Sequence, residues 1–440
     1  MGPGRRLAAP TIAMVALCAL GPASARAQGT PTDRRIDGDQ RLLKRHPRDA
    51  RGYYRLGDAY VQKARETGDV SYFTLAEDAL RESLAIAPGT SGVVRHLAYV
   101  LYSRHAFAEA AAEAARAIVL DPDDSYAHGI LGDVQLEVGR YGEAAETYQR
   151  MLALGADLYT LSRLAGLKSL HGDPAAAIAD LEEAIEDGKA GGRPAESIAW
   201  AQWQLGTEHF HLGDLNAAEV RYRDALVTYP RYHRALAGLG QVRAARADYP
   251  AAIALFREAI GILPQPDYVA ALGDVFVKTG RLDEARTQYA LVEYIGRLSA
   301  LNQVLYNREL AYFYLDHDTK LDQALALAQQ ELEVRRDIYA YDVLAWAWYK
   351  NGKPEAAAEA MREALKLGTR DARLFYHAGL IEHRLGRRDA ARQSLRHALT
   401  TNPHFHLLQA DEARRTLADL DAEPGGTPVS SPRQEVGHGQ

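Results

Sequence analysis

Two histidine pairs are the side chains of this 440-residue sequence best suited to binding a metal ion. His404 and His406 stand in the short sequence NPHFH, where a turn could bring both imidazoles to one cation, but no third ligand is evident. His209 and His211 are two positions apart in a segment of helical pattern, so their side chains point to different faces. The sequence therefore predicts no metal site and no bound cofactor.

Motifs that bind phosphate or carry out nucleophilic catalysis are missing from the sequence. It has no glycine-rich phosphate loop and no nucleophile elbow, and no pattern gathers its Asp and His residues into a triad. The only cysteine, Cys18, lies in an apolar stretch near the N-terminus. A chain that has lost this stretch has no thiol for catalysis, disulfides or zinc binding. We predict that the protein is not an enzyme.

The N-terminus has the pattern of an export signal. Arg5 and Arg6 supply a positive start, TIAMVALCAL at 11–20 is a short apolar run, and ASARA at 23–27 offers small residues for cleavage. The run is shorter than a membrane-spanning helix requires, so retention as an anchor is a less favoured alternative. The residues around the cysteine match a lipoprotein signal poorly, and acylation is also less favoured. We predict a periplasmic or secreted protein without a stable membrane span after cleavage.

Composition places the chain among ordinary globular proteins. It is 47% hydrophobic and 25% charged, which is not the balance of a disordered chain. The formal net charge of −6 offers no general basic surface for phosphate groups, so we predict no nucleic-acid partner.

A repeated landmark runs through most of the chain. It is a small residue that follows a large apolar one, at Gly57, Ala98, Gly132, Ala165, Gly206, Gly240, Gly273, Ala311, Ala345 and Gly379. Successive landmarks are 41, 34, 33, 41, 34, 33, 38, 34 and 34 positions apart. A step of this length is typical of arrays in which each unit is one helical hairpin. We therefore expect an all-α fold.

The second half of each unit repeats a pattern of its own. In GDLNAAEVRYRDALVTYPRY (213–232) a turn is followed by Ala218, then Tyr222 four positions later and Ala225 three beyond that. The small residues allow two helices to approach closely, and the proline or glycine that follows ends the second helix.

These two patterns resemble those of the tetratricopeptide repeat family. YYRLGDAY (53–60), YDVLAWAW (341–348) and FYHAGLIE (375–382) match the family's first helix, with its bulky residue, Leu-Gly pair and aromatic. The resemblance covers roughly residues 50–405. It implies a right-handed superhelical solenoid of antiparallel helix pairs, about ten units long, with a concave side lined by the first helix of each unit.

The predicted organisation has five parts. They are a signal peptide at 1–27, an N-terminal polar segment at 28–49 with a short helical stretch at its end, the solenoid at 50–405 with a possible hinge near 188–196, a capping helix at 406–421, and a disordered tail at 422–440.

One first helix concentrates aromatic residues. Because side chains three or four positions apart share a face, Tyr341, Leu344 and Trp348 form one stripe, and Asp342, Trp346 and Tyr349 form another. We expect Trp348 to pack in the core and Trp346 and Tyr349 to face the groove. The resemblance places the groove-lining positions at Tyr54, Asp58, Arg95, Tyr99, Tyr102, Tyr126, Asp133, Trp200, Trp203, Phe210, Arg308, Tyr312, Asp316, Tyr339, Asp342, Trp346, Tyr349, Arg373, Tyr376 and His383.

The favoured function is a non-enzymatic protein–protein interaction scaffold of the cell envelope, which binds a partner segment in this aromatic-lined groove. Rigid rings beside charged side chains make good anchors for a segment of an envelope or secreted protein. The alternative is a sensory module that binds a small molecule or a glycan on the same surface. A further reading of the aromatic residues is that several of them fill the space between neighbouring first helices.

Overall fold

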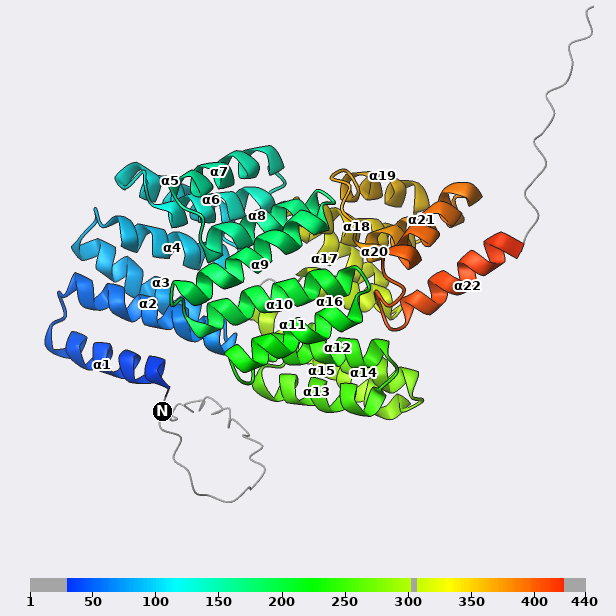
Figure 1. The fold of residues 1–440 in the computed structure, drawn as a ribbon, viewed down its shortest axis with the longest axis horizontal. Coiled ribbons are helices and arrows are strands. Elements are labelled where there is room, and N and C mark those ends of the chain that lie inside the picture. Colours follow the sequence, from blue (N-terminus) through cyan, green and yellow to red (C-terminus); the bar gives the residue numbers. More distant parts are fainter. Residues whose placement is uncertain (1–29, 302–306, 423–440) are drawn as a thin grey trace, which may run out of the picture.

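The computed structural model describes residues 30–301 and 307–422, and the regular structure within these ranges is entirely helical (Figure 1). The helices are α1 (Pro31–Arg45), α2 (Ala50–Thr67), α3 (Ser71–Ile86), α4 (Ser91–Ser103), α5 (Phe107–Leu120), α6 (Ser125–Glu137), α7 (Tyr141–Leu154), α8 (Leu158–Leu170), α9 (Pro174–Ala190), α10 (Ala195–His211), α11 (Leu215–Thr228), α12 (His233–Ala245), α13 (Tyr249–Ile262), α14 (Pro266–Lys278), α15 (Leu282–Leu301), α16 (Asn307–Asp316), α17 (Leu321–Val334), α18 (Ile338–Lys350), α19 (Pro354–Ala364), α20 (Ala372–Arg384), α21 (Arg388–Thr401) and α22 (Gln409–Ala422). From α2 to α21 each even-numbered helix, here called helix A, packs against the helix after it, here called helix B. The predicted all-α solenoid of antiparallel helix pairs is confirmed.

The small landmark residue of helix A explains why the two helices of a unit can touch. A methyl group added at Gly132 would lie 2.3 Å from the ring of Tyr148, and one at Gly379 would lie 2.6 Å from Leu395. In both units the large residue follows the small one by 16 positions. In the first unit the spacing is 23, because α2 and its link to α3 contain the inserted residues, and the landmark glycine there meets Leu80. The insertion therefore leaves the packing of the pair unchanged.

Aspartates fix the beginning of several helices A. The side chain of Asp124 accepts hydrogen bonds from the N–H groups of Tyr126 and Ala127, and Asp157 does the same for the start of α8. Asp337 and Asp371 cap α18 and α20 in the same way. Each cap satisfies N–H groups that the first turn of a helix leaves without a partner.

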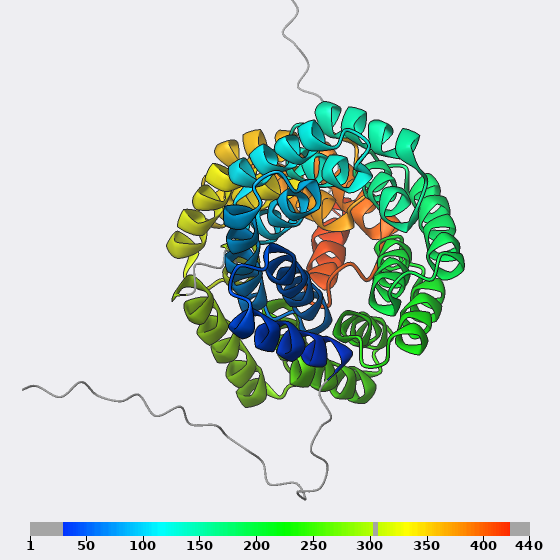
Figure 2. The same ribbon diagram turned by 90° about the vertical axis from the view of Figure 1, so that its left-hand side faces the viewer.

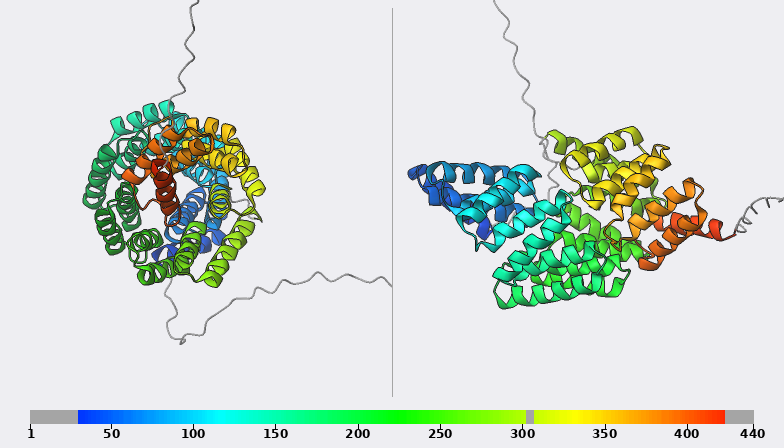
Figure 3. Two further views of the ribbon diagram at one scale, coloured as in Figure 1. Left: turned by 90° about the vertical axis from the view of Figure 1, so that its right-hand side faces the viewer. Right: turned by 90° about the horizontal axis from the view of Figure 1, so that it is seen from above.

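Seen end-on, the helix pairs follow a ring (Figure 2), and the view from the other end agrees (Figure 3). Contacts between units one turn apart close this ring. The amide of Ile338 donates to the hydroxyl of Tyr141 at 2.8 Å, across 197 positions of sequence, and Asn402 donates to the carbonyl of Phe210 at 2.7 Å, across 192. One superhelical turn therefore takes close to six units, and successive turns touch each other.

Both ends of the solenoid are covered by single helices. Helix α1 is longer than the short stretch expected from the sequence, because Thr30 and Asp33 form a capping box and Ile36 and Leu43 are buried on the first unit. Helix α22 covers the last unit and buries Leu420. It begins and ends within a few residues of the predicted cap.

The remaining parts of the predicted organisation are described only in part. The expected signal at 1–27 lies outside the described residues, as does the expected tail except for its first residue, which ends α22. The link at 191–194 between α9 and α10 contains Gly192 with a φ of 63°, and motion about it stays a prediction. In the ranges that the structure describes, no helix is long and apolar enough to cross a membrane.

Candidate functional site

The side chains assigned to a groove form a ladder of contacts between consecutive helices A. Each rung joins a ring on one helix to a ring, a cation or a carboxylate on the next. The rungs are Tyr54 with His96 (ring centroids 5.1 Å apart), Arg95 with Tyr126 (5.3 Å), Tyr126 with Tyr159 (5.1 Å), Trp203 with Arg234 (5.0 Å), Tyr312 with Asp342 (hydroxyl to carboxylate, 2.7 Å) and Trp346 with Tyr376 (5.7 Å). These contacts agree with the alternative prediction, in which several aromatic residues fill the space between neighbouring helices A.

The expected orientation of Trp346 is wrong. This ring is 1% exposed, whereas Trp348 is only partly buried. Trp346 stacks on Tyr349 at 5.0 Å and on His377 at 4.2 Å, and its indole N–H donates to Asp316 at 2.9 Å. The physical reason is that a helix A is flanked by helices A on both sides, so the face turned toward the hollow also packs against its neighbours.

A buried carboxylate lies beside this ring. Asp342 is fully buried and accepts hydrogen bonds from the hydroxyl of Tyr312 at 2.7 Å and from Nδ1 of His377 at 2.9 Å. Burial raises the pKa of Asp342, but the adjacent His377, Arg373 and Tyr312 outweigh burial and hold the pKa below its usual value. Asp342 thus joins α16, α18 and α20 and is not free to bind a partner.

The lowered pKa of Asp342 gives a prediction about pH. A carboxylate whose pKa is lower in the folded chain stabilises it above the unfolded pKa, about 4, and loses this effect as pH falls through the folded value. We expect Asp342→Asn to lower the free energy of unfolding by about 1–3 kcal/mol at pH 7, because the hydrogen bonds of a buried acceptor are disturbed. Denaturant titrations of both chains should show this difference shrinking below pH 4. A difference independent of pH would contradict the assignment.

The other predicted residues divide by exposure. Phe210, Tyr312 and Tyr376 are buried like Trp346 and Asp342. The partly buried ones are Tyr54, Asp58, Arg95, Tyr99, Tyr102, Tyr126, Asp133, Trp200, Trp203, Arg308, Asp316, Tyr339, Tyr349 and Arg373, and His383 is exposed.

One register of helix A stays accessible along the ring. It is the position six residues before the small landmark, and none of its eight described aromatic or charged members is buried: Arg51, Tyr126, Tyr159, Trp200, Arg234, Asp267, Tyr339 and Arg373. Sequence analysis missed Arg51, Tyr159, Arg234 and Asp267. Their fixed distance from the landmark is the signal that could have identified them.

A cavity of about 400 Å³ lies inside the ring, between α10, α14, α16, α20 and the segment after α21. The predicted groove residues that line it are Phe210, Arg308, Tyr312, Asp316 and Arg373. Asp267 and Glu309 line it too. Although the side chain of Asp267 is accessible, the surrounding ring displaces much of its solvent, and this desolvation together with the negative charge of Glu309 raises the pKa of Asp267 to about 6. The wall of the cavity therefore combines rings with charges of both signs.

Two arginines of the accessible register have rings as their neighbours. The guanidinium of Arg234 lies 5.0 Å from the ring centroid of Trp203, and that of Arg373 lies 4.1 Å from that of Tyr312. Within the described parts of the chain, neither arginine has a carboxylate at ion-pair distance. Their hydrogen-bond donors are available to carboxylate or carbonyl oxygens of an occupant.

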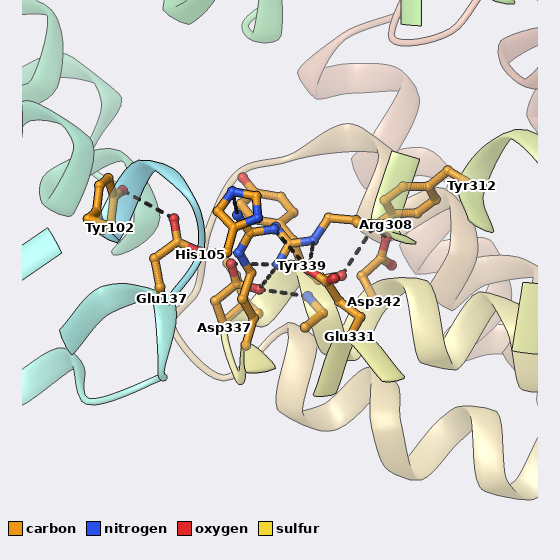
Figure 4. A network of polar contacts seen from close by, with 12 residues as sticks. Tyr102, His105, Glu137, Arg308, Tyr312, Glu331, Asp337, Tyr339 and Asp342 are labelled. Atoms are coloured by element: carbon orange, nitrogen blue, oxygen red, sulfur yellow. Dashed lines mark hydrogen bonds and ion pairs between the residues drawn. The ribbon is translucent and has the colours of Figure 1, made fainter. Parts of the chain in front are cut away.

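Polar side chains also join units that lie one superhelical turn apart (Figure 4). Arg335, which follows α17, reaches one turn across to Glu137 at 2.7 Å and to Nε2 of His105 at 2.7 Å. Burial and the positive charge of Arg335 lower the pKa of His105 to about 3, so the neutral imidazole accepts this hydrogen bond. Two predicted groove residues belong to this junction: Tyr102 donates to Glu137, and Arg308 pairs with Asp337.

The histidines considered for metal binding lie apart from each other or face other partners. His406 points to Asp274, with 3.6 Å between Nε2 and the carboxylate, and burial lowers the pKa of His406. Among the described residues, no group of three or more His, Cys, Asp or Glu is placed to hold a metal ion.

Comparison with known proteins finds a family model of one repeat type and a set of similar solved structures. A family model of the tetratricopeptide repeat matches residues 96–158, 203–265 and 343–404. No curated protein matches the chain. Similar solved structures include human IFIT1 as a dimer with m7Gppp-AAAA (14% identity, 76% of each chain covered, TM-score 0.49). They also include yeast Tom70 (14% identity, 89% of this chain and 92% of that one, TM-score 0.39) and PilW, a type IV pilus biogenesis factor (18%, 46% and 92%, TM-score 0.40).

Three separate matches to the repeat, together with the period of 34 residues and the packing of each helix pair, lead to one conclusion. The chain contains tetratricopeptide repeats at residues 96–158, 203–265 and 343–404, and a fold of this kind suggests a protein–protein interaction scaffold.

Proposed function

We propose that this protein is a non-enzymatic scaffold of the bacterial cell envelope that holds an extended segment of a partner protein inside its superhelix. The observation that carries the proposal is the accessible register of helix A, where the rings of Tyr126, Tyr159, Trp200 and Tyr339 occur together with Arg234, Asp267 and Arg373. The envelope location rests on the export pattern of residues 1–27.

The chemistry of this register suits a polypeptide. Tyr and Trp bury much area with few rotatable bonds, so they bind at low cost in entropy. An arginine stacked on a ring, as Arg234 is on Trp203, is held in place while its N–H groups remain free to bind backbone carbonyls or carboxylates. Trp346 takes no part in this surface because it is buried.

The alternative, a module that binds a small molecule or a glycan, would use the same rings. No separate feature of the described residues favours it over a polypeptide. The experiment below distinguishes the two, because only a polypeptide partner gives a crosslinked species of higher mass that contains a second protein.

The test is site-specific photo-crosslinking in intact cells. A photoreactive amino acid at position 234 is expected to capture an envelope or secreted protein, because this side chain is exposed on the inner surface. The matched control is position 227 on α11, a helix B, where Val227 is 84% exposed. Equal capture from both positions, or none from position 234 with the chain present in the envelope fraction, would contradict the proposal.

A substitution gives a second measurement at the same place. We expect Arg234→Ala to leave the free energy of unfolding within about 0.5 kcal/mol of the wild type, because the side chain is exposed. The same change should weaken partner capture from position 203 by about tenfold or more, since a charged hydrogen bond contributes about 1.5–3 kcal/mol. Arg223→Ala, on the helix-B surface, is the control and should leave capture unchanged. A loss of capture in both variants would point to a general effect on folding.

A further inference from the structure

The segment after the last repeat enters the hollow of the superhelix. Residues 402–411 comprise the link from α21 to α22, at 402–408, and the first turn of α22, and both end-on views place α22 within the outline of the ring (Figures 2 and 3). Gln409 donates to the carboxylate of Asp316 on α16 at 2.6 Å, and Lys278 at the end of α14 forms an ion pair with Asp411. This segment thus contacts helices A that precede it in the sequence by about 90 to 130 residues.

The side chains of this segment use the interior surface as a bound peptide would. The ring of Phe405 lies 5.4 Å from that of Tyr376 on α20, and Phe405 also lines both interior cavities with Phe210. Six positions later, the carboxylate of Asp411 meets Lys278. The segment therefore has an aromatic anchor at one end and a charged anchor at the other.

Space remains on both sides of the segment. Phe405 and His406 line the cavity of about 400 Å³ and a second one of about 310 Å³, whose other walls include Tyr249 and Phe256. Protein interiors are normally close-packed, so a segment with cavities on two sides forgoes part of the contact energy that a complete wall would have. Its loop from 403 to 408 also lacks the repeated backbone hydrogen bonds of a helix.

We propose that residues 402–411 are an intramolecular ligand of the interior, and that a partner segment with the same chemistry displaces them. The partner segment has an aromatic residue, followed six positions later by a carboxylate, which bind at Tyr376 and at Lys278 respectively. This inference rests on the proposed function and names the kind of segment that the interior accepts. The tethered segment competes at a high effective concentration, so the intact chain binds such a partner more weakly than a chain whose segment is loosened.

The probe is a fluorescent peptide with the sequence of residues 402–411, titrated into the full chain and followed by anisotropy. The loosened chain carries Phe405→Ala and Asp411→Asn, which remove both anchors while keeping every repeat. We expect the peptide to bind the loosened chain at least tenfold more tightly than the wild type. Equal affinity for the two chains would overturn the inference.

A charge exchange tests the second anchor. Adding Lys278→Glu to the loosened chain should abolish binding of the peptide, and a peptide in which Asp411 is replaced by lysine should restore it. The control is Lys366→Glu, at an exposed site outside both cavities, which should leave peptide binding unchanged. Binding that ignores the charge at position 278 would overturn the inference.

A third measurement does not depend on the variants being folded. In the wild-type chain, excess peptide should accelerate hydrogen exchange at the amides of the chain's own residues 402–411. Unchanged exchange at saturating peptide would overturn the inference. If the peptide experiments fail but crosslinking from position 234 succeeds, the scaffold function still stands and only this inference is wrong. If the peptide experiments succeed but crosslinking fails, the result counts against the scaffold function alone.

Discussion

Replacing Trp346 with alanine is expected to lower the free energy of unfolding by about 3–5 kcal/mol, the usual range for removing a large aromatic side chain from a core. The ring is stacked between Tyr349 and His377. Its removal leaves a cavity and takes the indole donor away from Asp316, whose carboxylate accepts from it at 2.9 Å. Guanidinium titration of the purified chain measures the loss.

The loss should be concentrated in the C-terminal units. In a repeat array each unit is stabilised mainly by its neighbours, so removal of a ring that joins α18 to α20 weakens that interface first. Hydrogen exchange should therefore accelerate in α16–α20 before it changes in α2–α8.

Trp348→Ala is the matched control, since it removes the same side chain two positions away. Trp348 is only partly buried and has Lys353 over its ring at 4.6 Å. Its replacement should cost less than half as much free energy. A larger effect at position 348 than at position 346 would show that the core lies on the opposite face of α18.

The repeat architecture was predictable from the sequence because it depends on contacts within one unit. The small residue of helix A and the large residue of helix B are 16 positions apart and touch, as Gly132 and Tyr148 do. Such a pair is specified locally, and its recurrence specifies the stack. Even the first unit keeps the contact, between Gly57 and Leu80, despite its insertion.

The environment of each groove residue was less predictable, because it depends on neighbouring units. Helical spacing correctly puts Trp346 and Tyr349 on one face, but it does not say that His377 of the next unit covers that face. Tyr159, Arg234 and Asp267 were missed for a different reason. The family resemblance assigned no groove residues to the units of Ala165, Gly240 and Gly273, whereas the accessible register has a fixed distance from the landmark whatever residue occupies it.

The closure of the ring was not predictable from residue types at all. The contact of Arg335 with Glu137 and His105 arises only because small rotations between units add up to a full turn after about six of them. No residue in either unit signals that its partner lies nearly 200 positions away. The interior is consequently bounded by touching turns, and an occupant gains access to it mainly from the two ends.

Two glycines make this closure testable. Gly139 and Gly172 have φ values of 76° and 78°, and an added methyl group would lie 2.4 Å from the carbonyl oxygen of Arg336 and 2.3 Å from that of Gly368, one turn away. Substituting alanine at both sites should force the turns apart. We expect a larger radius of gyration by small-angle X-ray scattering, with loss of about 1–2 kcal/mol per site from the left-handed backbone and a further 1–3 kcal/mol or so per site from the clash.

The control separates the clash from the backbone strain. Gly352 and Gly386 have nearly the same φ values, 73° and 74°, but nothing lies within 4 Å of an added methyl group. Alanine at these two sites should carry the backbone cost alone and leave the radius of gyration unchanged. If both pairs of substitutions had the same effect, the turns would not be in contact in solution, and the interior would be an open groove that a partner could enter from the side. If only the first pair expands the molecule, the closed ring restricts access to segments that enter from an end.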